Sequence, residues 1–253
     1  MIPSVNILGT LVSAVNSELA IATICHWIET GVKAYVCVRD VHGIIRALHD
    51  PEFKKIQNQA GMCVPDGMPT VLVGRYYGHT KMSRVRGADF MNQLSAVSVV
   101  KSIRHFYYGG KPGVADLLKH RMQARFPGLQ VVGTYSPPFR PLSSSQKAAF
   151  IAQIEALAPD IIWVGLSTPK QESWMAEYLE LLNVKVLIGV GAAFDFHTGL
   201  VKEAPKWMQK SGFEWLFRLF SEPRRLWKRY FYIIPLFLFH LSCQLSGLRK
   251  YKP

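Results

Sequence analysis

The hydrophobic positions of this chain gather in seven short runs, and stretches with helical spacing separate most of them. The runs are rich in β-branched and aromatic residues, which is typical of buried strands: 5–8, 34–38, 61–64, 105–109, 129–135, 161–167 and 185–191. Helical candidates between them include 41–49, 68–77, 113–125, 144–157 and 169–182. Strands that alternate with helices predict βαβ units, and therefore an α/β fold with a mostly parallel sheet.

The C-terminal part departs from this pattern. A helix with an apolar stripe is predicted over 214–220, a basic segment follows at 224–229, and 231–241 is apolar apart from His240. Eleven helical residues span about 16 Å, whereas the hydrocarbon core of a bilayer is about 30 Å thick. Pro235 also argues against a clean crossing. We therefore expect a segment that lies in the membrane interface; the alternative is a docked C-terminal helix pair inside a soluble oligomer.

Composition and charge support a large folded core with a basic end. The chain has 253 residues, of which 49% are apolar and 19% charged, so a sizeable core is expected and disorder is not. The formal charge is +13, and from residue 201 onward eleven lysines and arginines stand against three acids. We divide the chain into a core over 1–200 and an appendage over 201–253. Such a basic patch attracts nucleic acid, anionic lipid or a phosphorylated substrate.

Residues that could hold a metal or a disulfide are sparse. The four cysteines form no CxxC pair, no DxD or HExxH motif occurs, and no His/Cys cluster has zinc spacing. The N-terminus lacks a basic region followed by an apolar one, so no signal peptide is expected. These absences predict a reducing compartment and require neither a metal nor a cofactor.

Candidate site residues follow four of the apolar runs. In an open parallel sheet, ligands bind beyond the carboxyl ends of the strands. The four segments there are Pro65-Asp66-Gly67, Gly110-Lys111-Pro112-Gly113, Thr168-Pro169-Lys170-Gln171-Glu172 and Ala192-Ala193-Phe194-Asp195. Asp66 is either a turn or N-cap residue, or a catalytic base that Pro65 and the flexible Gly67 hold in place. Lys111, Lys170 and Gln171 could contact phosphate or sugar, and Asp195 could accept hydrogen bonds from a ribose.

Five motifs together resemble one enzyme family. They are "PDGMP", "YGGKPG", "GLSTPKQESWMA", "GVGAAFDFHTG" and "APKWMQKSGFEWLFRLFSEPRRLWKRY", and they run in order from about residue 34 to 230. The pattern resembles the WecG/TagA/CpsF glycosyltransferases, glycosyltransferase family 26. The resemblance implies a Rossmann-like sheet with helices on both faces and an inverting, metal-independent, membrane-associated enzyme. Such an enzyme moves a sugar, typically of N-acetylmannosamine type, from a UDP-sugar to a polyprenyl-diphosphate-linked saccharide in bacterial surface polysaccharide synthesis.

The resemblance also implies roles for particular residues. Asp66 matches the family's proposed catalytic base, and Gln171 and Asp195 match positions that line the nucleotide-sugar pocket. Arg218 and Arg225 match appendage residues that meet a diphosphate, and Lys228 stands near a third such position. Gly110, Lys111 and Lys170 are our further candidates for holding phosphate.

One departure concerns the end of the second predicted strand. Many members carry Thr-x-Asn there, whereas this chain has Val38 and Asp40. The donor sugar, or the way it is held, is therefore expected to differ.

Partners and rival functions follow from the same features. We expect a UDP-sugar, a lipid-linked acceptor and an anionic membrane surface as partners, at the cytoplasmic face of the plasma membrane, and no nucleic acid. The rival enzyme class is a nicotinamide oxidoreductase, but GxGxxG is missing after the first strand. The rival without catalysis is a basic module that binds nucleic acid or membrane.

Overall fold

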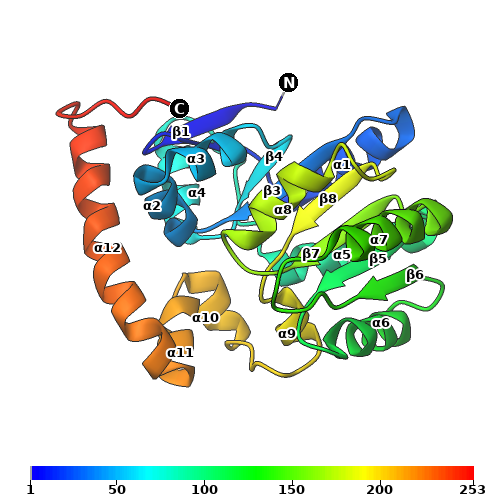
Figure 1. The fold of residues 1–253 in the computed structure, drawn as a ribbon. Helices are drawn as coiled ribbons and strands as arrows, with labels where there is room; N and C mark the ends of the chain where they lie inside the picture. The colour runs from blue at the N-terminus through cyan, green and yellow to red at the C-terminus, as the bar shows by residue number, and fades with distance from the viewer. Residues whose placement is uncertain (1) are drawn as a thin grey trace.

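Six parallel strands form the central sheet of the computed structural model, which describes residues 2–253 (Figure 1). Their spatial order is β4-β3-β8-β7-β5-β6. The bounds are β3 (Ala34–Arg39), β4 (Met62–Pro65), β5 (Arg104–Gly109), β6 (Gln130–Tyr135), β7 (Ile161–Gly165) and β8 (Val186–Gly189). The predicted α/β fold with a parallel sheet is therefore confirmed.

Helices cover both faces of the sheet. On one face, α1 (Ser17–Thr30), α5 (Gly87–Lys101), α6 (Val114–Arg125) and α9 (Ala193–His197) share a hydrophobic cluster with alternate strand residues such as Val36 and Trp163. On the other, α7 (Ser144–Leu157) and α8 (Lys170–Tyr178) pack with Cys37 and Ile162, and α3 (Pro51–Asn58) adds Ile56. Burial on both faces explains why the strands are continuous apolar runs in the sequence.

The first predicted strand is real but lies outside the main sheet. β1 (Ser4–Ile7) pairs antiparallel with β2 (Thr10–Ser13) as a separate hairpin. Its apolar side packs against α2 (Val41–His49) and α4 (Met68–Tyr76) in a third hydrophobic cluster. Antiparallel pairing needs only a short turn, whereas a parallel strand needs a crossover.

The chain ends in three helices: α10 (Lys206–Ser211), α11 (Glu214–Ser221) and the long α12 (Pro223–Leu245). α12 continues through Pro235 and stands beside the rest of the fold (Figure 1). Ile233 and Phe237 are buried in the third cluster, while Phe231 and Phe239 on another side of the helix are 80% and 62% exposed. The predicted boundary between 1–200 and 201–253 stays a prediction, because α12 shares this cluster with the hairpin and α2.

The length and hydropathy of α12 bear on the membrane question. Across residues 2–253, no helix is both long and apolar enough to cross a bilayer. α12 is docked on the protein along one side and exposes aromatic side chains along another. It thus combines features of both sequence-based interpretations.

Candidate active site

The register of the sheet brings two carboxylates together. Arg39, the last residue of β3, pairs with Pro65, the last residue of β4. Asp40 and Asp66, the residues that directly follow these two strands, therefore lie side by side at the carboxyl edge of the sheet. The backbone N–H of Asp66 donates to the Arg39 carbonyl oxygen at 2.9 Å, which ties the two strand ends to each other.

A cleft lined largely by polar groups opens at this edge, and we call it the polar pocket. Its walls come from the ends of β3, β4 and β8, the start of α8, and the C-terminal helices. The charged or amide side chains in its lining are Asp40, Asp66, Arg86, Gln171, Glu214, Arg218, Arg225 and Arg229. A site with four arginines suits a ligand that carries phosphate.

A second cleft, the apolar groove, runs between the start of α4 and the middle of α12. Its lining is mostly hydrophobic, and its apolar residues are Val41, Met68, Pro69, Trp215, Tyr230, Ile233, Ile234, Phe237 and Leu238. It shares Asp66, Glu214 and Arg218 with the polar pocket, together with Asp40 and His42. Asp66 therefore stands at the junction of a charged cleft and a hydrophobic one.

The carboxylate of Asp66 does not cap the following helix. Gly67 is the N-cap of α4, and no side chain bonds to the first amides of that helix. The N-cap alternative for Asp66 is thus wrong. Gly67 has φ −93°, an angle open to other residues, so its special backbone freedom is not used either.

Charged neighbours surround Asp66 on three sides. Its Oδ1 lies 3.5 Å from Nη2 of Arg84, and the Nε of Arg84 donates to the Asp66 carbonyl oxygen. Burial raises the pKa of Asp66 to about 6; Arg84 opposes this shift, while Glu214 and Asp40 add to it. The side chain still keeps 29% of its surface open to the clefts. Asp66 is therefore a carboxylate with raised basicity that a substrate can reach.

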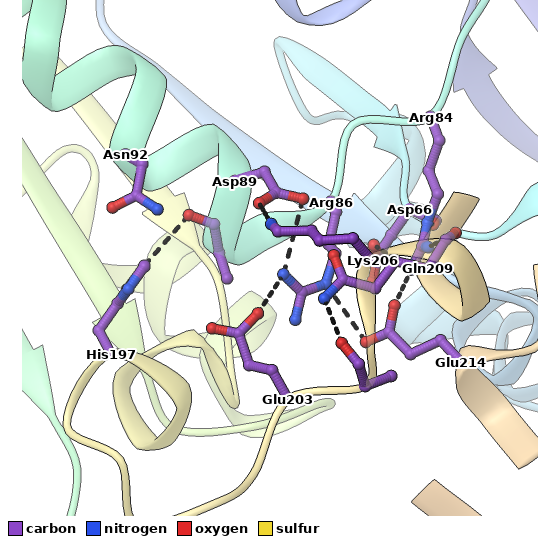
Figure 2. A network of polar contacts seen from close by, with 12 residues as sticks. Asp66, Arg84, Arg86, Asp89, Asn92, His197, Glu203, Lys206, Gln209 and Glu214 are labelled. Atoms are coloured by element: carbon purple, nitrogen blue, oxygen red, sulfur yellow. Dashed lines mark hydrogen bonds and ion pairs between the residues drawn. The ribbon is translucent and has the colours of Figure 1, made fainter. Parts of the chain in front are cut away.

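An ion-pair network connects Asp66 with the appendage. Glu214 of α11 places Oε2 2.7 Å from Nη2 of Arg84 and Oε1 3.2 Å from Nε of Arg86. Arg86 also pairs with Glu203 at 2.8 Å, and the backbone carbonyl of Gln209 accepts from Arg84 at 2.9 Å (Figure 2). These contacts fix the wall between the two clefts.

Sequence reasoning missed Arg84, Arg86 and Glu214 as site residues. The sequence did contain a sign of these residues: Arg84 and Arg86 stand two positions apart just before α5, and Glu214 lies inside the longest of the five family motifs. Their pairing, however, joins residues about 130 positions apart, which spacing alone does not reveal.

Asp40 and Gln171, two of the residues predicted to bind substrate, line the polar pocket. One oxygen of Asp40 accepts from the Gly43 amide at 2.9 Å and caps α2, and the other lies 3.7 Å from Arg229 of α12. Gln171 is buried, and its Oε1 has no hydrogen-bond partner among the residues that the structure describes. The neighbouring Glu172 is buried in an ion pair with Arg39 at 2.9 Å.

Arg218 and Arg225 also line the polar pocket, and Arg218 reaches the groove as well. The guanidinium of Arg218 lies over the Phe196 ring at 5.7 Å, and its Nε is buried without a hydrogen-bond partner in the described part of the chain. A buried unsatisfied donor at a cleft is a group that a ligand can satisfy.

Five predicted substrate-binding residues do not line either cleft: Gly110, Lys111, Lys170, Asp195 and Lys228. Gly110 has φ +75°, and a Cβ there would meet Val114 at 2.8 Å, so this position needs glycine for a tight turn. Lys170 is an exposed first residue of α8, and Lys228 lies over the ring of Trp227. Burial raises the pKa of Asp195, and the charges of Lys111 and Arg225 oppose that shift.

The pKa of Asp66 gives an expected pH dependence. A base must be ionised, so we expect kcat/KM to fall about tenfold per pH unit below pH 6 and to level off above it. His42 is the histidine that lines both clefts; burial lowers its pKa to about 4, so it is neutral around pH 6. A pH profile of kcat/KM checks this, and an acid limb centred near 4 would contradict the assignment of Asp66 as the titrating base.

The fold and the two clefts define an α/β protein that binds its ligands at the carboxyl edge of a parallel sheet, between that edge and a helical appendage. The family described as "Glycosyl transferase WecG/TagA/CpsF family" matches residues 5–251. The chain therefore belongs to this family and is a glycosyltransferase, which confirms the resemblance and sets aside the nicotinamide oxidoreductase.

Two relatives from bacilli are similar over most of the chain. A protein of Bacillus subtilis (strain 168) is 29% identical over 204 residues, covering 81% of this chain and 77% of its own. A protein of Bacillus spizizenii (strain W23) is 31% identical over 203 residues, covering 80% and 77%. Both are named N-acetylglucosaminyldiphosphoundecaprenol N-acetyl-beta-D-mannosaminyltransferase.

Proposed function

We propose that this glycosyltransferase moves a hexose of N-acetylmannosamine type from a UDP-sugar to a polyprenyl-diphosphate-linked saccharide, with inversion at the transferred carbon. The observation that carries the proposal is the position of Asp66 on the wall shared by the polar pocket and the apolar groove. The names of the two relatives support both the sugar and the lipid-linked acceptor.

The polar pocket suits the donor. Arg218 and Arg225 supply positive charge where a diphosphate would lie, and Gln171 offers a buried side-chain carbonyl oxygen to a sugar or ribose hydroxyl. Val38 and Asp40 line the same pocket in place of the Thr-x-Asn pattern. The ionised carboxylate of Asp40 lacks the N–H donor of an asparagine amide, and its two oxygens are directed to the Gly43 amide and to Arg229.

Asp66 performs the proton transfer in one displacement. The acceptor hydroxyl oxygen attacks the anomeric carbon of the donor sugar, and Asp66 takes the hydroxyl proton. The bond from that carbon to the diphosphate oxygen breaks, and its electron pair leaves with UDP. The arginines of the polar pocket stabilise the charge that develops on the leaving diphosphate. A single attack from the opposite face inverts the configuration.

The substrate assignment is tested by UDP release across a panel of UDP-sugars, with and without an N-acetylglucosaminyl diphosphate lipid. We expect release with UDP-N-acetylmannosamine that depends on the acceptor. If none of the UDP-sugars on the panel gives UDP release, the proposal is overturned. Acceptor-independent release would overturn the transfer step.

Metal independence is a separate expectation. Within the described part of the chain, no three His, Cys, Asp or Glu side chains come together as a group that could hold a metal ion. The arginines of the polar pocket can neutralise the diphosphate instead, so EDTA should change turnover less than about twofold. Loss of turnover on chelation that Mg²⁺ or Mn²⁺ restores would contradict this prediction.

Membrane association is proposed from the exposed side of α12. Phe231 and Tyr232 are 80% and 62% exposed there, beside the basic residues Arg224 and Lys228. Aromatic and cationic side chains on one helix face suit an anionic headgroup layer, which for this lipid-linked substrate is the cytoplasmic leaflet. The chain would then meet its acceptor at the surface of the membrane. Homo-oligomer formation stays a prediction.

Replacing Phe231 and Tyr232 with serine should weaken binding to anionic vesicles at least tenfold, since each buried aromatic side chain contributes about 1.5–3 kcal/mol. Truncation of the helix is a poorer test, because Ile233 and Phe237 belong to a core cluster. Sedimentation with vesicles measures the effect, and sedimentation with DNA at matched salt tests the nucleic-acid rival. Unchanged vesicle binding in the variant would exclude this face as the anchor.

A further inference from the structure

The apolar groove changes in character along its length. At one end it carries Asp66, Arg84 and Arg218, which are charged. Away from that end its walls are hydrophobic, with Met68 and Pro69 of α4 facing Ile234 and Leu238 of α12. A ligand that fits such a groove has a charged end and a long apolar remainder.

The groove is continued outward by exposed apolar side chains. Leu72 and Tyr76 follow Met68 on α4 at intervals of four residues, so the three lie on one side of that helix. The side chains of Leu72 and Tyr76 are 58% and 68% exposed, and Leu238 on the opposite wall is 58% exposed. At the far end of α4 the two helices meet again, where the side-chain amide of Gln244 donates to the Tyr77 hydroxyl at 3.4 Å.

We propose that this groove holds the first isoprenoid units of the acceptor lipid, with the lipid diphosphate at its charged end. Arg218 lines both clefts, so its guanidinium, which has five N–H donors, can contact the lipid diphosphate from the groove and the donor diphosphate from the polar pocket. This inference rests on the proposed function and specifies where its acceptor binds. The sugar of the acceptor then lies at Asp66, between the diphosphate and the donor in the polar pocket. The isoprenoid chain leaves along α4 and α12 toward the exposed side of the molecule.

Two observations favour a lipid diphosphate over another occupant. Among the residues that the structure describes, none accepts a hydrogen bond from the buried Nε of Arg218, and a phosphate oxygen would do so. The groove also opens directly onto the carboxylate that receives the acceptor proton, so its occupant must present a hydroxyl there. A second copy of the chain or an apolar peptide would present neither group.

The proposal predicts that recognition of the acceptor depends on its chain. The full-length protein would be assayed with N-acetylglucosaminyl diphosphate carried on a farnesyl group or on a methyl group, both without membranes. We expect the KM for the farnesyl acceptor to be at least about tenfold lower, because isoprene units leave water for the groove. Equal KM values for the two acceptors would overturn the proposal.

Variants of α12 test whether the lower KM for the farnesyl acceptor comes from the apolar groove. Replacing Ile234 and Leu238 with glutamine keeps helix propensity but makes one wall of the groove polar. We expect the KM for the farnesyl acceptor to rise roughly tenfold, with the KM for the methyl acceptor and kcat unchanged. Leu245→Gln is the matched control: the same residue type, 39% exposed on the same helix and outside the groove, which should change neither KM. Equal rises for both acceptors, or an equal effect of Leu245→Gln, would overturn the proposal.

A binding measurement separates this inference from the proposed function. Calorimetry would compare farnesyl diphosphate with methyl diphosphate on the wild-type chain and on the Ile234/Leu238 variant. Tighter binding of the farnesyl compound that the variant loses supports the groove even if no sugar donor is turned over. Equal affinity for the two diphosphates overturns the groove even if transfer occurs.

Discussion

Replacing Asp66 with asparagine should lower turnover by about 10²–10⁴-fold, the range typical of a lost general base. The substitution keeps the size of the side chain and removes its basicity. Asp66 does not cap a helix, and among the described residues the ion-pair partner of its carboxylate is Arg84 at 3.5 Å, a contact whose loss alone would not lower turnover so far. Single-turnover measurement of sugar transfer checks the effect on the chemical step.

Stability and donor binding are the controls for Asp66→Asn. The pKa of Asp66 is raised to about 6 in the fold from its ordinary value of 3.8, so the folded state holds the proton more tightly than the unfolded chain. This contribution to stability is fully present below pH 3.8 and is lost as the pH rises through 6. The neutral asparagine is therefore expected to leave the fold at least as stable at pH 7.5, with unchanged UDP affinity. Near-normal turnover would return Asp66 to the role of a turn residue.

Arg218→Gln should lower kcat by about 10²–10³-fold, since it removes a cation that lines both clefts and that is expected to stabilise the leaving diphosphate. Arg224→Gln is the matched control, because Arg224 is exposed, belongs to the same appendage and lines neither cleft. Steady-state kinetics on a detergent-soluble acceptor compares the two without membrane binding. Equal losses in both variants would mean that the appendage contributes only general positive charge.

The sequence predicted the sheet well because its strands are buried on both faces. Runs such as 161–167 and 185–191 are apolar apart from Ser167 and Lys185 at their ends, and β7 and β8 lie within them. The helix predicted over 144–157 coincides with α7, whose Ser143 forms a capping box with Gln146. Local signals of this kind are short-range and survive in the sequence alone.

Elements that depend on tertiary packing were less visible. α5 was not among the named helices, and it buries Ser95 and Ser98 along with its apolar residues, so its pattern has no clear apolar stripe. The apolar run 231–241 indicated an interfacial segment, but only the structure shows that Ile233 and Phe237 pack on the hairpin cluster. Such contacts join residues more than 200 positions apart in the chain.

The site residues also divide into those that local sequence motifs predicted and those that depend on tertiary packing. The polar pocket contains Asp66, Gln171, Arg218 and Arg225, which motifs had singled out. The Arg84–Glu214–Arg86 network and the apolar groove were not predicted, because each arises where the appendage closes on the core. Conversely, Lys111 and Lys170 follow strand ends in the sequence but lie outside both clefts, since a loop position alone does not fix where a long side chain points.

The stereochemistry of transfer tests the central claim most directly. If Asp66 is the single base of a direct displacement, the α-linked sugar of the UDP donor must become β-linked in the product. Nuclear magnetic resonance of the anomeric position in the product of the wild-type enzyme measures this linkage. We predict a product that contains only the β-linked sugar. An α-linked product would contradict a direct displacement with Asp66 as the single base.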